Sequence, residues 1–172
     1  MLEAKNFLEN LRELGVGFFT GVPDSLLKDL NSCILDCIDG RNHIIAANEG
    51  GAIALASGYH IATSKIPLVY LQNSGLGNTI NPLLSLADPA VYSIPMILLI
   101  GWRGEPGVKD EPQHCKQGAV TKETLDAIGV SYEILTESPG DMLSQLKRVI
   151  DQSKKNQSPM ALLVRKGSFA KY

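Results

Sequence analysis

Glu49 is the residue in this sequence whose surroundings most favour chemistry. It follows Asn48 and opens a run of small and aliphatic residues that includes Gly50, Gly51 and Gly58. Asn48 is a typical N-cap residue, and an acidic side chain suits the first turn of a helix, so Glu49 could have a purely structural role. Each glycine, however, costs a helix about 1 kcal/mol relative to alanine. This cost indicates that another backbone or a ligand approaches the helix closely, which makes Glu49 a candidate functional carboxylate.

Three further turns carry unusual polar residues after predicted strands: residues 21–25, 72–78 and 101–105. If the strands are parallel, these turns and Glu49 meet at one edge of the sheet, where ligands bind in such folds. Each turn alone is a weak signal. Asp24 or Ser25 could equally cap a helix. Residues 74–78 could form only a tight turn, because they lack the third glycine of the dinucleotide-binding fingerprint.

Residues 101–118 are predicted to form a long loop, because they contain two prolines and show neither a helical nor a strand period. Loops of this length are commonly functional or disordered. Arg103, between a tryptophan and a glycine, indicates anion recognition, although an ordinary surface charge fits the pattern equally well. His114 is a candidate acid or base, but a solvated loop histidine is the more common case. His43 and His60 are expected to be structural.

The composition is that of an ordinary globular protein. The chain has 172 residues, of which 44% are hydrophobic and 20% charged, and its net charge is −2. One domain with a sizeable core is therefore expected. No cluster of lysine and arginine indicates nucleic-acid binding, and no apolar run reaches the roughly 18 residues of a membrane span. Because the first residues also lack the order of a signal peptide, we expect a cytoplasmic protein that binds neither nucleic acid nor membranes.

The three cysteines predict neither a metal site nor a disulfide framework. Cys33 and Cys37 lie four residues apart in a predicted helix and are expected to be buried structural thiols, while Cys115 falls in the predicted loop. Their number is odd, and no spacing matches a zinc site. No metal ligands are expected in this chain.

The elements that must position the candidate residues alternate between helix and strand. Helices are predicted over residues 3–14, 25–38, from 49 onward, 78–87, 121–128 and 139–153, and strands over 16–20, 43–47, 67–71, 95–100, 131–135 and 160–164. Strands that are plain apolar runs, separated by helices, indicate a parallel sheet covered on both faces. The predicted fold class is α/β: one domain over residues 1–172, with a doubly wound, mostly parallel sheet and helices on both faces.

These motifs resemble the pyrimidine-binding (Pyr) domain of thiamine diphosphate enzymes. The resemblance rests on residues 21–27, 47–50, 71–78, 81–83, 101–107, 110–114 and 165–167, and so extends over nearly the whole chain. Within that superfamily the sequence is most similar to phosphonopyruvate decarboxylases. The string Gly-Trp-Arg-Gly-Glu-Pro-Gly is specific to them, whereas the helix after Glu49 alone would identify only the superfamily.

The resemblance implies a thiamine diphosphate-binding fold and a set of cofactor-binding residues. In relatives, the glutamate that matches Glu49 hydrogen-bonds N1′ of the aminopyrimidine, and this helps the ring to take the proton from C2 of the thiazolium. Glu49 is thereby the predicted catalytic residue. Val22, Pro23, Asp24 and Asn78 are the other residues predicted to bind the cofactor.

The resemblance implies substrate contacts as well. Ser25 matches a serine that faces the substrate in related decarboxylases, and Gln72 or Asn73 stands where some relatives have a catalytic histidine. Without that histidine, proton transfer falls to Asp24, to His114 or to a residue of a partner domain. The predicted substrate residues are Ser25, Gln72, Asn73, Arg103 and His114.

The resemblance further implies a partner for this chain. Relatives hold the diphosphate and Mg²⁺ in a second domain through a Gly-Asp-Gly motif, which does not occur in this sequence. We therefore expect thiamine diphosphate and Mg²⁺ as cofactors, with the diphosphate-binding domain supplied either by a longer chain or by a separate β subunit. A homo-oligomer formed through the Pyr domain, at least a dimer, is also implied, and no activity is expected without the second domain.

The function implied by the resemblance is decarboxylation of a small 2-oxo acid. The expected reaction converts 3-phosphonopyruvate to phosphonoacetaldehyde and CO2, in phosphonate biosynthesis. One alternative is the α subunit of a sulfopyruvate decarboxylase, whose substrate carries a sulfonate in place of the phosphonate. A second alternative is a non-catalytic Pyr-like domain that serves as an assembly partner, although the presence of Glu49 argues against it.

Overall fold

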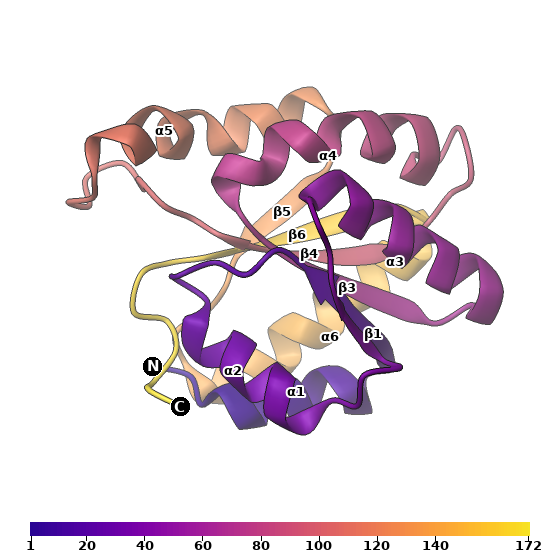
Figure 1. Ribbon diagram of the computed structural model, residues 1–172, viewed down its shortest axis with the longest axis horizontal. Helices are drawn as coiled ribbons and strands as arrows, with labels where there is room; N and C mark the ends of the chain where they lie inside the picture. Colours follow the sequence, from indigo (N-terminus) through magenta and orange to yellow (C-terminus); the bar gives the residue numbers. More distant parts are fainter.

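A six-stranded sheet, parallel throughout, forms the centre of the computed structural model, which describes residues 1–172 (Figure 1). The strand order is β2-β1-β3-β4-β6-β5. The strands are β1 Val16–Gly21, β2 His43–Ile45, β3 Ile66–Gln72, β4 Met96–Gly101, β5 Ser131–Ile134 and β6 Pro159–Val164. All five strand pairs are parallel, so the predicted α/β class with a parallel sheet is confirmed.

Helices cover both faces of the sheet, as predicted. The helices are α1 Ala4–Glu13, α2 Lys28–Cys37, α3 Glu49–Thr63, α4 Leu76–Pro82, α5 Pro112–Ala127 and α6 Pro139–Asn156. In Figure 1, α1, α2 and α6 lie below the sheet, and α3, α4 and α5 lie above it. A 3₁₀ turn (η1 Asn73–Gly75) precedes α4 and a π turn (η2 Leu83–Ala87) follows it. None of the helices combines the length and the apolar composition that crossing a membrane requires.

Two hydrophobic cores result, one on each face of the sheet. In β4, Ile97 and Leu99 belong to the core under α1, α2 and α6, whereas Leu98 and Ile100 belong to the core under α3, α4 and α5. Every residue of β4 is buried. Both faces are covered, which explains why this strand is an unbroken apolar run rather than an alternating one.

The two ends of the chain meet beside α1. Leu2 pairs with Phe169 in a parallel bridge, with Leu2 N donating to Ser168 O at 2.7 Å and Ala170 N donating to Leu2 O at 2.9 Å. The Phe169 ring packs edge-on against Phe7, with 5.1 Å between ring centroids. The segment after β6 is therefore held against the body of the protein.

One predicted element is wrong at its end, over residues 112–118. Residues 101–118 are not a continuous loop, because α5 begins at Pro112 and runs through the predicted helix 121–128. Pro112 suits the first turn of a helix. The buried residues of α5 are Gly118, Thr121 and Leu125, so the helix packs mainly through small and polar groups and shows no apolar stripe. Cys115 lies in this helix and is exposed.

The start of α2 and the state of one cysteine also differ from the predictions. The helix begins at Lys28 rather than near residue 25, and no side chain caps it, so neither Asp24 nor Ser25 has the capping role. Cys33 is buried as predicted, but Cys37 is exposed. Cys37 is the last residue of α2, where the helix leaves the core.

Candidate active site

The carboxyl ends of the parallel strands place the predicted turns at one edge of the sheet. Asp24 and Ser25 follow β1, Glu49 follows β2, Gln72 ends β3, and Arg103 follows β4. In a parallel sheet this edge is the usual place for ligands.

Glu49 lies at the start of α3 with one carboxylate oxygen engaged. Asn48 caps the helix as predicted, because its side-chain oxygen accepts from Gly51 N at 2.8 Å. Asn78 Nδ2 donates to Glu49 Oε2 at 2.7 Å, while Glu49 Oε1 accepts no hydrogen bond within the chain. Glu49 is half-buried and both asparagines are exposed, so this chain alone does not enclose the carboxylate. The carboxylate is thus oriented through one oxygen, and its other oxygen has no hydrogen-bond partner within the chain.

Two glycines permit the close packing around Glu49. A Cβ at Gly75 would collide with the Glu49 carboxylate, and a Cβ at Gly50 would lie 2.8 Å from Asn78 O. The predicted close approach of another backbone is therefore confirmed at Gly50. At Gly51 the nearest atom to such a Cβ is Asn48 Oδ1 at 3.5 Å, and at Gly58 the space is open, so this chain does not explain these two glycines.

Asp24 is buried without a hydrogen-bond partner for its carboxylate. Its exposed fraction is 5%, and neither carboxylate oxygen forms a well-aligned hydrogen bond, although the backbone N–H groups of residues 25–27 lie near the carboxylate. Oδ2 lies against Gly101, where a Cβ would not fit. Burial raises the pKa of Asp24, while the Arg103 charge and nearby backbone N–H groups lower it by less. Val22 and Pro23, on the same turn, are half-buried and exposed respectively.

Arg103 is fixed between an aspartate and a serine. Its Nε and Nη2 donate to the two oxygens of Asp110 at 2.8 and 2.6 Å, and its Nη1 donates to Ser25 Oγ at 2.9 Å. Asp110 also accepts from Gly104 N at 2.8 Å. The hydrogen bonds from Arg103 hold the pKa of Asp110 well below its usual range. Arg103 thus contacts Ser25 directly, while Asp110 holds the guanidinium in place. Asp110 was not among the predicted site residues.

Asn73 holds the turn that carries Arg103. Its Nδ2 donates to Arg103 O at 2.8 Å and to Thr121 Oγ1 at 2.9 Å, and its Oδ1 accepts from Arg103 N at 3.1 Å. Both amide hydrogens are used within the protein, which makes Asn73 a positioning residue in this chain. The neighbouring Gln72 accepts from Ser74 Oγ at 2.9 Å and keeps its amide nitrogen free.

His114 lies in the first turn of α5 rather than in a loop. The residue is half-buried, and its Nδ1 is buried without a hydrogen-bond partner. Its backbone carbonyl contacts Gly104, where a Cβ would not fit. This contact joins the start of α5 to the turn that carries Arg103. Trp102, on the same turn, is buried and donates from Nε1 to Gly118 O at 2.9 Å, so its role is packing rather than anion binding.

A pocket of about 330 Å³ opens beside Ser25 and Arg103. Lys28 and Lys166 line it as well, and the candidate residues of the sequence did not include them. Lysines on a surface carry no distinctive pattern, and Lys166 lies more than 60 residues beyond Arg103 in the chain, so only the fold brings these cations together.

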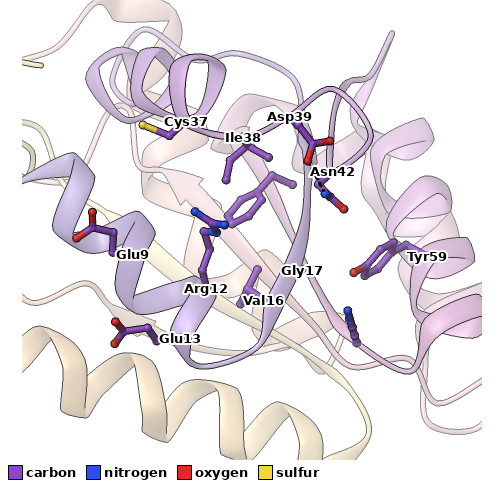
Figure 2. Close-up of a pocket in the computed structure, with 12 residues that line it drawn as sticks. Glu9, Arg12, Glu13, Val16, Gly17, Cys37, Ile38, Asp39, Asn42 and Tyr59 are labelled. Carbon is purple, nitrogen blue, oxygen red and sulfur yellow. Dashed lines mark hydrogen bonds between the residues drawn. The ribbon is translucent and has the colours of Figure 1, made fainter.

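The largest pocket lies at the opposite edge of the sheet, where the strands begin. It has a volume of about 630 Å³ and is lined by Val16 and Lys65, among others. Figure 2 shows Glu9, Arg12 and Glu13 of α1 on one side of it and Tyr59 of α3 on the other. None of the predicted site residues lines it, so the smaller pocket at the carboxyl edge fits the chemistry better. No three His, Cys, Asp or Glu side chains are grouped so that they could hold a metal ion.

Most of this chain matches a known protein family. Residues 3–129 match the family described as thiamine pyrophosphate enzyme, N-terminal TPP binding domain, where TPP is thiamine pyrophosphate, another name for thiamine diphosphate.

Curated relatives include both kinds of decarboxylase. The chain is 34% identical to a phosphonopyruvate decarboxylase of Streptomyces hygroscopicus over 99% of this chain and 41% of that protein. It is 36% identical to one of Streptomyces viridochromogenes over 83% of this chain and 35% of that protein. It is 32% identical to the sulfopyruvate decarboxylase subunit alpha of Methanococcus maripaludis over 87% of this chain and 86% of that protein. The chain therefore spans less than half the length of the two phosphonopyruvate decarboxylases.

Solved structures share the fold at low sequence identity. Benzoylformate decarboxylase from Polynucleobacter necessarius superposes with a TM-score of 0.75 at 21% identity, covering 100% of this chain and 31% of that one. The 4-hydroxybenzoylformate decarboxylase of Rhodococcus jostii RHA1 gives a TM-score of 0.68 at 19% identity, and the superposition covers 99% of this chain and 31% of that one. The predicted fold is confirmed by both.

Proposed function

Since this chain belongs to the family of thiamine pyrophosphate enzymes, as their N-terminal TPP-binding domain, we propose that it forms the pyrimidine-binding half of a phosphonopyruvate decarboxylase active site. The proposed reaction converts 3-phosphonopyruvate to phosphonoacetaldehyde and CO2. Its main support is the Glu49 carboxylate, which Asn78 orients at a helix start while one oxygen stays free. The names of the relatives that are 34% and 36% identical support the choice of substrate.

The residues around Glu49 fit the aminopyrimidine of thiamine diphosphate. The free oxygen of Glu49 would accept a hydrogen bond from the protonated ring nitrogen. Gly75 has no side chain, and this leaves room for the Glu49 carboxylate. Val22, Pro23, Asp24 and Asn78 would complete the contact with the cofactor. When bound, thiamine diphosphate supplies the electron sink for loss of CO2 from a 2-oxo acid. Glu49 itself holds the proton at the pyrimidine nitrogen.

The turns after β1, β3 and β4 would receive the substrate. Arg103 donates to Ser25 Oγ, so the hydroxyl hydrogen of Ser25 is free to be donated to a substrate carboxylate. Gln72 and His114 keep polar atoms without protein partners, the Gln72 amide nitrogen and His114 Nδ1. We assign them to the substrate side, with Asn73 positioning the Arg103 turn.

A second protein domain is needed to complete this site. The sequence contains no Gly-Asp-Gly motif, and the half-exposed Glu49 needs a covering surface. The proposed partner binds the diphosphate and Mg²⁺, as a further domain or as a β subunit. The proposed assembly contains at least two copies of this chain and acts in the cytoplasm.

A sulfopyruvate decarboxylase α subunit is the second candidate. One observation favours it: the alignment covers 86% of the Methanococcus maripaludis subunit, a protein of similar length to this chain. The two reactions differ only in the acid group carried by the substrate. Steady-state rates of the assembled enzyme with 3-phosphonopyruvate and with sulfopyruvate distinguish them, because the true substrate gives the higher kcat/KM.

Calorimetric titration of thiamine diphosphate with Mg²⁺ tests the proposed half-site. Little binding is expected to this chain alone, and binding with decarboxylation is expected once a diphosphate-binding partner is added. In that assembly, Glu49→Gln should lower kcat roughly 100-fold or more, since glutamine keeps a hydrogen bond but loses the charge. Glu13→Gln, on the exposed side of α1, serves as the control. Unchanged activity of Glu49→Gln would favour the non-catalytic Pyr-like domain instead.

A further inference from the structure

We propose that the pocket between Lys28, Arg103 and Lys166 binds the second acid group of the substrate, the phosphonate. This inference rests on the proposed function and adds the determinant of substrate choice. Three separate segments supply the three cations: the start of α2, the turn after β4 and the turn after β6. Their convergence on one pocket is a property of the fold, because nothing in the chain order places them together.

The charges that line the pocket favour an anion. Neither Lys28 nor Lys166 forms an ion pair within the protein, and the acidic residue in the lining is Asp29. Asp29 Oδ1 accepts from Tyr172 N at 3.3 Å, a bond that leaves the carboxylate charged, so Asp29 offsets one of the two lysines. Arg103 is balanced by Asp110, so the unpaired lysines leave the pocket with an excess of positive charge.

Arg103 can still bind an anion although it is paired. Three of its five N–H donors are used, by Asp110 and Ser25, which leaves two free. The guanidinium is held in place by the bidentate contact with Asp110, so little side-chain freedom is lost when a ligand binds. The same arginine contacts Ser25, which the proposed function places at the substrate carboxylate. One residue thereby links the two acidic ends of a short substrate.

The turn that carries Lys166 is ordered by its own hydrogen bonds. Gly167 has a φ of 83°, and Ser168 Oγ donates to Arg165 O at 2.9 Å. Arg165 Nε lies 2.8 Å from Glu105 Oε1 in an ion pair that joins this turn to the one after β4. Phe169 follows the turn and packs against Phe7, closing one side of the pocket. Lys166 is therefore presented from a fixed turn.

The excess of positive charge favours a phosphonate over a sulfonate. A phosphonate can carry two negative charges and a sulfonate only one, so the two lysines gain more from the phosphonate. A substrate without a second acid group, such as pyruvate, gains nothing from them. The lysines are thus expected to set the preference among 2-oxo acids without taking part in the loss of CO2.

Lysine substitutions in the assembled enzyme test this assignment. Lys28→Met and Lys166→Met should each lower kcat/KM for 3-phosphonopyruvate roughly threefold, and the double variant about tenfold, mainly through KM. The same variants should leave kcat/KM for pyruvate unchanged. Lys65→Met removes the same charge at the opposite edge of the sheet and is the matched control. Equal losses with both substrates, or no loss with 3-phosphonopyruvate, would overturn the assignment.

A binding measurement separates this inference from the proposed function. In ¹⁵N NMR spectra of this chain, 3-phosphonopyruvate should shift the resonances of residues 25–29, 103 and 166–169, and the double variant should abolish these shifts. If the assembled enzyme decarboxylates no 2-oxo acid, the proposed function fails and the NMR result alone decides the site. Shifts confined to other residues, or shifts that persist in the double variant, would refute the pocket.

Discussion

Two aspartates next to Arg103 have pKa values shifted in opposite directions. Asp110 receives two hydrogen bonds from the guanidinium, which stabilise its charged form and lower its pKa. Asp24 has no hydrogen-bond partner, and burial raises its pKa. Asp110 therefore fixes the arginine, while Asp24 stays a group that can hold a proton near the site. A buried carboxylate without a partner destabilises a fold, so its presence here fits a functional role.

Asp24→Asn is expected to stabilise the isolated chain at neutral pH. The folded state binds the Asp24 proton more tightly than the unfolded state, so wild-type stability falls as the pH rises from the ordinary aspartate pKa through the raised pKa of folded Asp24. Asparagine avoids this loss, and the variant should gain about 1–3 kcal/mol at pH 7.

Urea unfolding of the chain from pH 7 down toward pH 4 measures this effect. The gain should shrink as the pH falls through the raised pKa of folded Asp24, because the folded state then takes up a proton and no longer buries a charge. Asp36→Asn, at an exposed position of α2, should show no such trend. A variant less stable than wild type at pH 7 would mean that the Asp24 carboxylate has a stabilising partner.

At the scale of elements, the positions of the apolar strands could be predicted from the sequence, whereas the packing of α5 could not. β3, β4 and β6 match their predicted ranges within a residue or two, since each is a buried apolar run. α5 packs through Gly118, where an added Cβ would collide with Gly104 O. Such backbone-to-backbone packing produces no periodic pattern of hydrophobic residues in the sequence of the helix. Asn73 likewise donates hydrogen bonds to Arg103 and Thr121, which lie 30 and 48 positions further along the chain. The Asn48 cap before Glu49 and the close approach at Gly50 were predictable, because both signals are local in the sequence.

The glycines of α3 should respond differently to substitution by alanine. Gly50→Ala is expected to destabilise the chain by about 1–3 kcal/mol, since the new Cβ would lie 2.8 Å from Asn78 O. Gly58→Ala should stabilise it by about 0.5–1 kcal/mol, because the space there is open and alanine is the better helix former. Thermal unfolding of the two variants checks both signs. A similar shift for both would show that helix propensity alone governs α3.

At the scale of the whole molecule, the tail after β6 joins stability to the site. Phe169 packs on Phe7 in the core under α1, α2 and α6, and it also lines the pocket with Lys166. The same few residues thus contribute to the core and to the proposed phosphonate pocket. Loss of the tail contact should affect both properties together.

Phe169→Ala is expected to cost about 3–5 kcal/mol of stability, as for other buried aromatic residues. The Lys166 turn should lose its support, so KM for 3-phosphonopyruvate should rise while kcat changes less. Tyr172→Ala, an exposed aromatic residue of the same tail, is the control and should have little effect on stability. Urea unfolding and steady-state kinetics give the two readouts, and a stable variant with unchanged KM would contradict the link.

The pairing of Leu2 with Phe169 brings residues 1 and 172 close together, as the N and C marks in Figure 1 show. A short linker could join residues 172 and 1, and the chain could then be opened within the exposed residues 89–92, where no helix or strand would be cut. Circular permutation is tolerated at such exposed connections. Since this segment precedes β4, the new ends would lie at the opposite edge from Glu49. A permuted form of residues 1–172 would therefore have no chain ends at the proposed active-site edge.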